Sequence, residues 1–337
     1  MAVSYGLPRV PAPHEREVGG IVKLQALHRL FPHRPHRFNV LYLVTSRLPH
    51  GAASLARAAR RKGARVVVNQ NGVAYPGWCR EGWERVNAPM RALLPLADHV
   101  FYQSAFCRES ADRFLGQPRG GWEILYNAVD TKRFHPSARP PDRLTLLLGG
   151  SQDLRYRIAT ALEVLALVVR ERPDVQLLVT GRLRWLPSGR ASRQDADRMA
   201  RDLGVLDRVS FLGPYTQADA PDIFRRAHIL LHTKYNDPCP TVVLEGMGSG
   251  LPVVYSRSGG VPELVGEEAG IGVAAEKSWE RDDPPQPAAM AAAVIALSEP
   301  DRYRAASASA RSRTVERFDL DPWLDRHRTV FQSLVSS

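Results

Sequence analysis

Residues 235–265 read YNDPCPTVVLEGMGSGLPVVYSRSGGVPELV. This stretch contains a polar turn around Asp237 with two prolines, a helix start at 241–247, an apolar run at 252–255 and a second turn at Gly259-Gly260. Short apolar strands that alternate with helices and polar turns are typical of a parallel sheet, which binds ligands beyond the carboxyl ends of its strands. The stretch therefore predicts an α/β fold with a ligand site near Asp237.

The same alternation extends through the rest of the chain in two series. In the first half, the runs expected as strands are 38–44, 65–68, 98–102 and 122–126. In the second half, they are 144–148, 175–179, 209–213, 229–232 and 252–255. The proline-rich segment 135–142 between the two series is the expected linker, and 274–287 is expected to be a surface loop. The pattern predicts two Rossmann-like domains in tandem.

The chain has 337 residues and a formal net charge of +11. Such a charge favours an anionic partner, namely nucleotide phosphates, an acidic membrane surface or nucleic acid. Residues 1–65 hold Glu15 and Glu17 as their acids, against twelve Lys and Arg. Two explanations remain open: a solvated arginine-rich surface, and a basic face that meets a membrane or an acidic acceptor.

Several sequence features point to a cytoplasmic protein. Apolar runs stay well short of the roughly 18 residues that a membrane helix needs, and the first residues lack the pattern of a secretion signal. The three cysteines lie far apart, as in a protein of a reducing compartment. They match no metal-ligand spacing, and neither do the histidines, so no metal site is expected.

Asp237 and Glu245 are the candidate binding carboxylates. A carboxylate can accept hydrogen bonds from the hydroxyls of a sugar or ribose, and the helix that begins at Thr241 offers free N–H groups to a diphosphate. On spacing alone, the simpler interpretation is that Asp237 caps this helix and that Glu245 lies on its solvated face.

A longer ordered set of motifs favours the binding role. The chain resembles the family 4 retaining glycosyltransferases of the GT-B fold, and the matching segments are YNAVD (126–130), DRVSFLG (207–213), LEGM (244–247), GLPVV (250–254) and GGVPE (259–263). The closing segment 318–331 resembles the family's final helix, which crosses back to the N-terminal domain. The resemblance implies two Rossmann-like domains that face each other across a cleft. The acceptor domain would comprise residues 1–140 with 318–337, and the donor domain 141–317.

The resemblance also implies site residues, with three departures from the family pattern. Asp237 stands where the family has Glu and would bind hydroxyls of the donor sugar, while Glu245 would bind the ribose. The family holds the diphosphate with an Arg and a Lys after the first C-terminal strand, where this chain offers Arg155 and Arg157 but no lysine. Asn71 takes the place of a histidine near the reacting sugar, and an amide can position a hydroxyl but cannot act as a base.

Other residues are implied around the donor. Gly19 and Gly20 resemble the glycine loop that approaches the diphosphate, and Gly213 would lie near the nucleobase. The remaining implied donor-binding residues are Gly150, Cys239 and Thr241. An aromatic set could form an acceptor wall or simply core packing: Tyr75, Trp78 and Trp83.

The expected function is a metal-independent, retaining transfer of a sugar from a nucleotide diphosphate sugar to a hydroxyl of a sugar, glycolipid or small-molecule acceptor. No other cofactor is expected. A sugar-nucleotide-binding protein that has lost catalysis is the alternative suggested by Asn71 and the missing lysine. An epimerase on the same fold is disfavoured by the Asp237–Glu245 signature, and a nucleic-acid binder by the lack of a recognised module. A cytoplasmic location is expected, with the basic N-terminal domain as a candidate contact to the inner face of the membrane.

Overall fold

The computed structural model describes residues 1–15 and 19–336, which form two compact units. The first unit comprises Met1–Ala128, Ser278–Asp282 and Leu320–Ser337, and the second comprises Val129–Lys277 and Asp283–Asp319. The proline-rich segment 135–142 lies within the second unit. Each unit contains one parallel sheet with helices on both faces, as the alternation of strands and helices predicts.

The sheet of the first unit has the strand order β1-β2-β3-β4-β5. Its strands are β1 (Val3–Ser4), β2 (Val40–Val44), β3 (Arg65–Gln70), β4 (His99–Tyr102) and β5 (Gly121–Ile124). Val3 pairs with Val40 and also forms an isolated parallel bridge with His33, on its side away from β2. If this bridge is counted as the second strand in chain order, the sheet has six strands in the order 2-1-3-4-5-6. The switch point, where such sheets bind ligands, then lies between β1 and β2.

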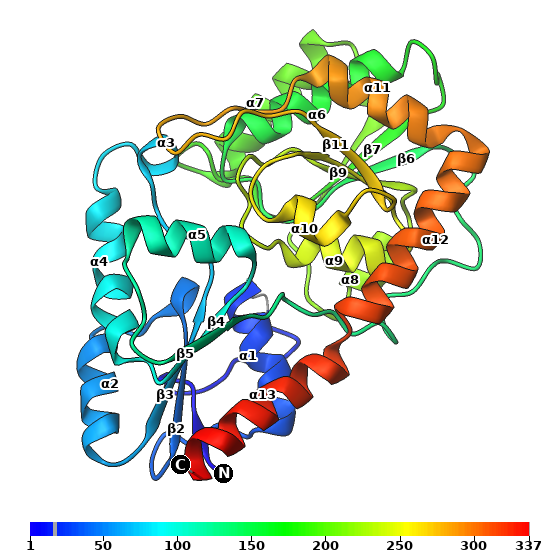
Figure 1. The fold of residues 1–337 in the computed structure, drawn as a ribbon. Coiled ribbons are helices and arrows are strands. Elements are labelled where there is room, and N and C mark those ends of the chain that lie inside the picture. Colours follow the sequence, from blue (N-terminus) through cyan, green and yellow to red (C-terminus); the bar gives the residue numbers. More distant parts are fainter. Residues whose placement is uncertain (16–18, 337) are drawn as a thin grey trace. The chain divides into compact units, whose positions relative to one another are not determined.

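Alternate side chains of β2 pack into two apolar layers. Leu41 and Leu43 contact the layer of α2, α4 and α5, whereas Val40 and Tyr42 contact that of α1 and α13. Figure 1 shows these two groups of helices on the two faces of the sheet. The helices of this unit are α1 (Gly19–Leu30), α2 (Ala52–Arg61), α3 (Pro76–Cys79), α4 (Trp83–Leu93), α5 (Ala105–Phe114) and α13 (Leu320–Ser336), with the 3-10 turns η1 (Thr45–Arg47) and η2 (Leu94–Leu96). The last helix therefore returns to the N-terminal unit, as expected.

Residues 278–282 belong to the first unit although their chain neighbours on both sides belong to the second. We call this segment the strap. Its Trp279 is buried and stacks on Phe106 at 5.1 Å between ring centroids, with Tyr75 and Phe114 edge-on. The expectation of a surface loop at 274–287 is wrong at Trp279, because the indole fills an aromatic core formed by residues far away in the sequence. Tyr75 packs in this core as well.

The strap lies against Gly77 so closely that a larger residue would displace it. Gly77 N donates a 2.8 Å hydrogen bond to Trp279 O, and a Cβ at Gly77 would lie 2.6 Å from Arg281 N. We expect Gly77→Ala to lower the free energy of unfolding of the first unit by about 1–3 kcal/mol, the cost typical of overpacking. Gly189→Ala is the control, since a Cβ there would meet Leu183 O at an ordinary 3.5 Å. Equal urea-unfolding midpoints for wild type and Gly77→Ala would contradict this account.

The sheet of the second unit has the order β11-β10-β9-β6-β7-β8. Its strands are β6 (Thr145–Leu148), β7 (Gln176–Thr180), β8 (Val209–Gly213), β9 (Ile229–His232), β10 (Val253–Ser256) and β11 (Gly270–Val273). β6 comes first in the chain and pairs with both β7 and β9. The switch point of this sheet therefore lies between β6 and β9.

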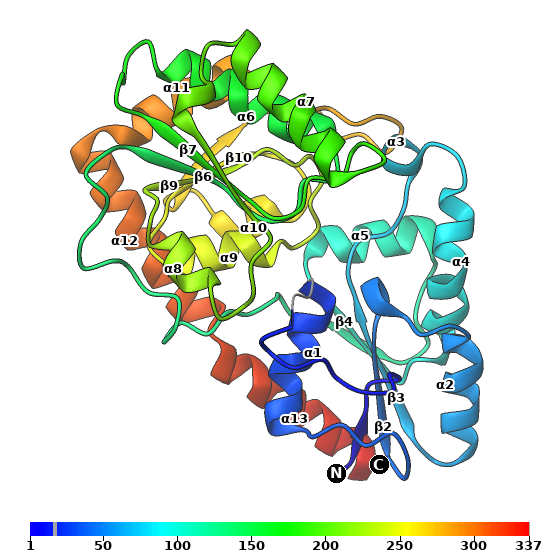
Figure 2. The same cartoon turned by 180° about the vertical axis from the view of Figure 1, so that it is seen from behind.

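The helices of the second unit also form two layers. Helices α6, α7 and α11 cover one face of the sheet, and α9 lies on the other face with α8, α10 and α12 (Figure 2). Their bounds are α6 (Arg155–Val168), α7 (Gly189–Asp202), α8 (Ala220–Phe224), α9 (Thr241–Gly248), α10 (Val261–Val265), α11 (Pro287–Ser298) and α12 (Pro300–Arg317), with the 3-10 turn η3 (Leu206–Arg208).

Candidate functional site

Two chain segments meet at the switch point of the second sheet: residues 149–154 after β6 and residues 233–240 after β9. Gly149 lies against the first turn of α9, because a Cβ there would come within 2.4 Å of Val242 Cγ2. Gly246 allows α9 to approach β9, since its Cβ would lie 2.9 Å from Leu230 Cδ2. These close approaches place the N-terminus of α9 at the carboxyl end of β6. Free N–H groups and the positive end of the helix dipole are therefore presented there.

The segment after β9 is held rigidly. Its anchoring hydrogen bonds are Thr233 Oγ1 to Arg157 O (2.9 Å), Tyr235 N to Tyr156 Oη (3.0 Å), Asn236 N to Ser258 Oγ (2.9 Å) and Gly260 N to Asp237 O (2.9 Å). Asn236 has a φ of +48°, in the left-handed region that asparagine tolerates better than most residues. The positions of residues 234 and 237 are therefore fixed by their neighbours.

Asp237 lies in a positively charged environment. Its Oδ1 is 3.1 Å from Lys234 Nζ, and its Oδ2 is 3.2 Å from His232 Nε2. The second contact is within hydrogen-bonding distance, and the imidazole helps to lower the pKa of Asp237 as a hydrogen-bond donor. Burial alone would raise the pKa of Asp237, but Lys234, His232 and Arg157 together hold it well below its ordinary value. Asp237 is thus ionised throughout the neutral range, while burial lowers the pKa of His232 and keeps it neutral.

The two candidate arginines have different surroundings. Arg157 is only 6% exposed, donates from Nη1 to Ser151 O at 2.7 Å, and lies close enough to Asp237 for each to shift the other's pKa. Arg155 is half exposed and binds Asp195 of α7 through Nε at 2.7 Å. The structure brings Arg157 together with Asp237 and engages Arg155 with α7.

Glu245 is a buried carboxyl on α9. Burial raises its pKa to about 7, although the hydrogen bond from Gln217 Nε2 to Oε1 at 3.2 Å and the charge of Arg133 both act to lower it. The carboxyl is therefore poised to change its charge near neutral pH. Asp237 and Glu245 differ in charge state because Asp237 has cations close by and Glu245 has mainly burial.

Glycines occupy the carboxyl ends of three neighbouring strands. Gly150, Gly181 and Gly213 all have φ between +73° and +84°. Gly181 N donates to Gly213 O at 2.9 Å, and a Cβ at Gly181 would lie 2.2 Å from Gly150 O. This glycine rim, as we call these three residues, lets backbone and ligand approach closely where side chains would intervene.

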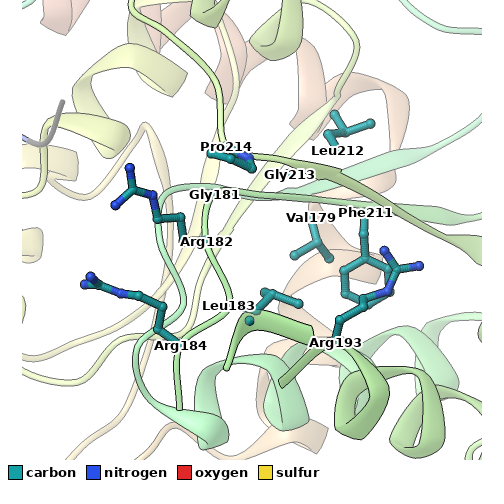
Figure 3. A pocket seen from close by; sticks show the side chains of 11 residues that line it. Val179, Gly181, Arg182, Leu183, Arg184, Arg193, Phe211, Leu212, Gly213 and Pro214 are labelled. Carbon is teal, nitrogen blue, oxygen red and sulfur yellow. The ribbon is translucent and has the colours of Figure 1, made fainter. Parts of the chain in front are cut away.

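A pocket of about 480 Å³ opens beside the rim. Val179, Leu183 and Phe211 supply apolar surface, and Arg182 and Arg184 extend along one side of the pocket while Arg193 lies beside Phe211 (Figure 3). Arg193 covers the Phe211 ring at 4.1 Å from its centroid. The pocket can hold a flat group between apolar walls and arginine donors, and Gly213 is one of the residues that line it.

Two predicted donor residues lie between Asp237 and Glu245. Cys239 is buried in the turn before α9, and Thr241 is the first residue of that helix. In the described parts of the chain, no group of three or more His, Cys, Asp or Glu side chains could hold a metal ion.

The site residues predicted in the first unit gather at its own switch point. Gly19 and Gly20 form the first turn of α1, and a Cβ at Gly20 would lie 2.6 Å from Ser46 Oγ in the turn after β2. Asn71 follows β3 and exchanges hydrogen bonds with Thr45, since Thr45 Oγ1 donates to Asn71 Oδ1 (3.0 Å) and accepts from Asn71 N (3.1 Å). The structure thus joins Asn71 to the turn that packs against Gly20.

Residues 130–312, more than half of the chain, match the family described as glycosyl transferases group 1. The chain belongs to this family. Curated relatives include D-inositol 3-phosphate glycosyltransferases. That of Mycolicibacterium smegmatis is 28% identical over 152 residues, covering 43% of this chain and 34% of the relative. That of Streptomyces avermitilis is 26% identical over 187 residues, covering 52% and 40%. The matched part of this group 1 chain spans between a third and two fifths of the length of these relatives.

Solved structures of similar fold cover nearly the whole chain. WaaG, a glycosyltransferase involved in lipopolysaccharide biosynthesis, has a TM-score of 0.70 at 17% identity and covers 98% of this chain and 99% of its own. Sucrose-phosphate synthase from Thermosynechococcus elongatus has a TM-score of 0.72 at 20% identity, covering 93% and 76%. Anabaena HepE in complex with UDP-glucose has a TM-score of 0.68 at 17% identity, covering 93% and 82%. These neighbours confirm the predicted GT-B fold.

Sequence reasoning did not identify Lys234 of this group 1 chain as a site residue. Lys234, two residues after β9, pairs with Asp237, whereas a lysine was expected only after the first C-terminal strand. The signal that could have revealed it was its position three residues before Asp237, at a strand end that borders the switch point. Gln217, the hydrogen-bond donor to Glu245, lies after β8 and carried no comparable signal.

Proposed function

We propose that the chain transfers a sugar from a nucleoside diphosphate sugar to an acceptor hydroxyl, with retention at the anomeric carbon and without a metal or other cofactor. The carrying observation is that Asp237 and Arg157 lie close together beside the N-terminus of α9, the helix that carries Glu245, at the switch point of the second sheet. An ionised carboxylate, a titratable carboxyl and a buried guanidinium suit a ligand that has hydroxyls at two places and phosphates between them.

We assign each of these groups to one part of the nucleotide sugar. Glu245 accepts hydrogen bonds from the ribose, Asp237 orients hydroxyls of the donor sugar, and Arg157 meets the diphosphate with the N–H groups near Thr241 and Cys239. The pocket beside the glycine rim takes the nucleobase, with Gly150 and Gly213 allowing the backbone to approach. Arg155, held by Asp195, positions the start of α6.

The proposed reaction needs little covalent chemistry from the protein. The acceptor oxygen forms a bond to the anomeric carbon from the face that the diphosphate leaves, the bond from that carbon to the phosphate oxygen breaks, and this oxygen takes the acceptor's proton. The protein orients the reactants and stabilises the departing charge.

The kind of acceptor is inferred from the positive charge on the surface of the first unit. Arg57, Arg61 and Lys62 are exposed on and just after α2. Relatives named D-inositol 3-phosphate glycosyltransferase suggest an anionic acceptor, which such a face would attract. Contact with an anionic membrane from the cytoplasmic side is the other arrangement that this face favours. No described helix is both long and apolar enough to cross a bilayer.

A nucleotide screen tests the proposal. We expect one of UDP, GDP or ADP, or a sugar conjugate of one, to raise the melting temperature of the chain without added metal, because a ligand of the native state stabilises it by mass action. At a hundred times the dissociation constant the stabilisation is about 2.7 kcal/mol. The absence of any shift across all three nucleotide series would reject the proposal.

A sugar-nucleotide-binding protein without catalysis is the second candidate, favoured by the amide of Asn71 where a histidine is usual. Both candidates predict a thermal shift. Incubation of the chain with the donor that binds distinguishes the two candidate functions. Release of free sugar, or transfer to an acceptor from a cell extract, supports the enzyme. An unchanged donor supports the binding protein.

A further inference from the structure

The cluster around Asp237 has more hydrogen-bond donors than the protein uses. Arg157 is 6% exposed, and its Nε has no hydrogen-bond partner among the residues that the structure describes. A buried N–H group without a partner loses about 1–3 kcal/mol relative to its hydrated state. Such a group is expected where a ligand supplies the missing acceptor.

Lys234 adds accessible donors to this cluster. Its side chain is 29% exposed, and its Nζ lies 3.1 Å from Asp237 Oδ1. An ammonium has three N–H groups, so two remain beyond the one that meets Asp237. The residues around it, Thr233, Tyr235 and Asn236, are held by the hydrogen bonds described above. Lys234 is therefore presented from a fixed backbone position.

The charges of the cluster leave room for an anion. Arg157, Lys234 and Arg184 carry three positive charges against the two negative charges of Asp237 and of Asp153, which acts on Arg157 and pairs with Arg184, and the neighbouring His232 is neutral. The N-terminus of α9 adds a partial positive charge at the same strand ends. A bound phosphate would meet both the charge and the N–H groups of this cluster.

We propose that Lys234 binds the sugar-linked β-phosphate of the nucleotide donor, with Asp237 as the residue that positions its ammonium. The proposal rests on the proposed function. Because Asp237 is there assigned to the donor sugar and Glu245 to the ribose, the cation paired with Asp237 lies toward the sugar end of the diphosphate. Lys234 thus supplies the lysine that the segment after β6 lacks, from the neighbouring strand end instead.

The test compares nucleoside diphosphates with monophosphates by isothermal titration calorimetry. For the base that the wild type prefers among UDP, GDP and ADP, we expect Lys234→Met to weaken diphosphate binding by ten- to a hundredfold, the range of a charge-assisted hydrogen bond. Monophosphate binding should change less than threefold. Lys234→Arg should restore most of the diphosphate affinity, because it keeps the charge.

Lys132→Met is the matched control, since it removes the same charge from an exposed position of the second unit to which no role in binding is assigned. If Lys234→Met binds diphosphate as tightly as wild type, or weakens mono- and diphosphate equally, Lys234 does not bind the β-phosphate. The second result would mean that the lysine only supports the loop. A wild type that binds no nucleotide would reject the proposed function itself and this inference with it.

Discussion

Asp237→Ala is expected to lower the free energy of unfolding of the second unit by about 3 kcal/mol. Removing one partner of a buried ion pair leaves the other charge uncompensated, which typically costs about 3–5 kcal/mol. The charges that lose their partner are those of Lys234, which pairs with Asp237, and of the nearby Arg157, which is 6% exposed. Lys234 is 29% exposed and can regain hydration, so the lower end of the range applies. Hydrogen exchange of amides in β9 and α9 would report this loss for the second unit by itself.

Two further variants separate charge from volume. Asp237→Asn keeps the size of the side chain but removes its charge, and we expect it to lose nearly as much stability as Asp237→Ala. Asp153→Ala breaks the pair with Arg184, in which both side chains are more than half exposed, and should cost at most about 1 kcal/mol. If Asp237→Asn were as stable as wild type, the charges around Arg157 would not hold this site together.

Asp237→Ala should also separate binding of the nucleotide from recognition of the donor sugar. Without Asp237, Arg157 and Lys234 keep their positive charges, so free nucleoside diphosphate should still bind. The nucleotide sugar should lose the affinity that its hydroxyls gain from this carboxylate, and turnover should fall with it. Equal losses for nucleotide and nucleotide sugar, measured by calorimetry, would reject the role of Asp237 at the donor sugar.

The sequence predicted five strands of the second sheet because they are short, largely apolar runs bounded by glycine and polar turns, but it did not predict β11. β6 and β9 are examples, and each is buried along its whole length. β1 was not expected, because two residues carry no periodicity and its place in the sheet depends on pairing with Val40. Trp279 escaped for a related reason: its aromatic partners lie more than 150 positions away along the chain.

The pairing of strands that are distant in the sequence also determines which residues of the site the sequence could predict. Asp237 and Glu245 could be chosen from one continuous stretch, but the choice between Arg155 and Arg157 could not. Their surroundings depend on Asp195 of α7 and on the loop after β9, which is 76 positions from Arg157 at Thr233. The place of Lys234 at the site depends on the pairing of β9 with β6, which a single stretch of sequence does not show.

The stability of the ligand-free chain should depend on pH through Glu245. Its pKa is raised from 4.5 to about 7 in the folded state, so the folded chain holds this proton more tightly than the unfolded chain. The resulting stabilisation is fully present below pH 4.5 and is lost as the pH rises through about 7. At 1.36 kcal/mol for each pH unit, this carboxyl should cost the free chain about 3 kcal/mol between pH 4.5 and pH 8.

Glu245→Gln should remove this contribution, because the amide does not titrate and keeps nearly the same volume. The difference between the urea-unfolding free energies of wild type and variant, measured from pH 5 to pH 8, isolates the carboxyl from every other titrating group. A constant difference across that range would contradict a raised pKa at Glu245.

Nucleotide binding should show the opposite dependence on pH. In the proposed site the ribose hydroxyls donate to the carboxylate, so binding requires the ionised form and releases a proton when Glu245 starts neutral. Affinity should therefore fall by up to about tenfold for each pH unit below 7. Calorimetry at pH 6 in two buffers of different ionisation enthalpy measures the released proton directly.

The phosphates of the ligand also titrate near this pH, so the decisive quantity is the difference in proton release between wild type and Glu245→Gln. If both release the same number of protons, Glu245 does not hold the ribose, and the donor assignment of α9 fails at that residue.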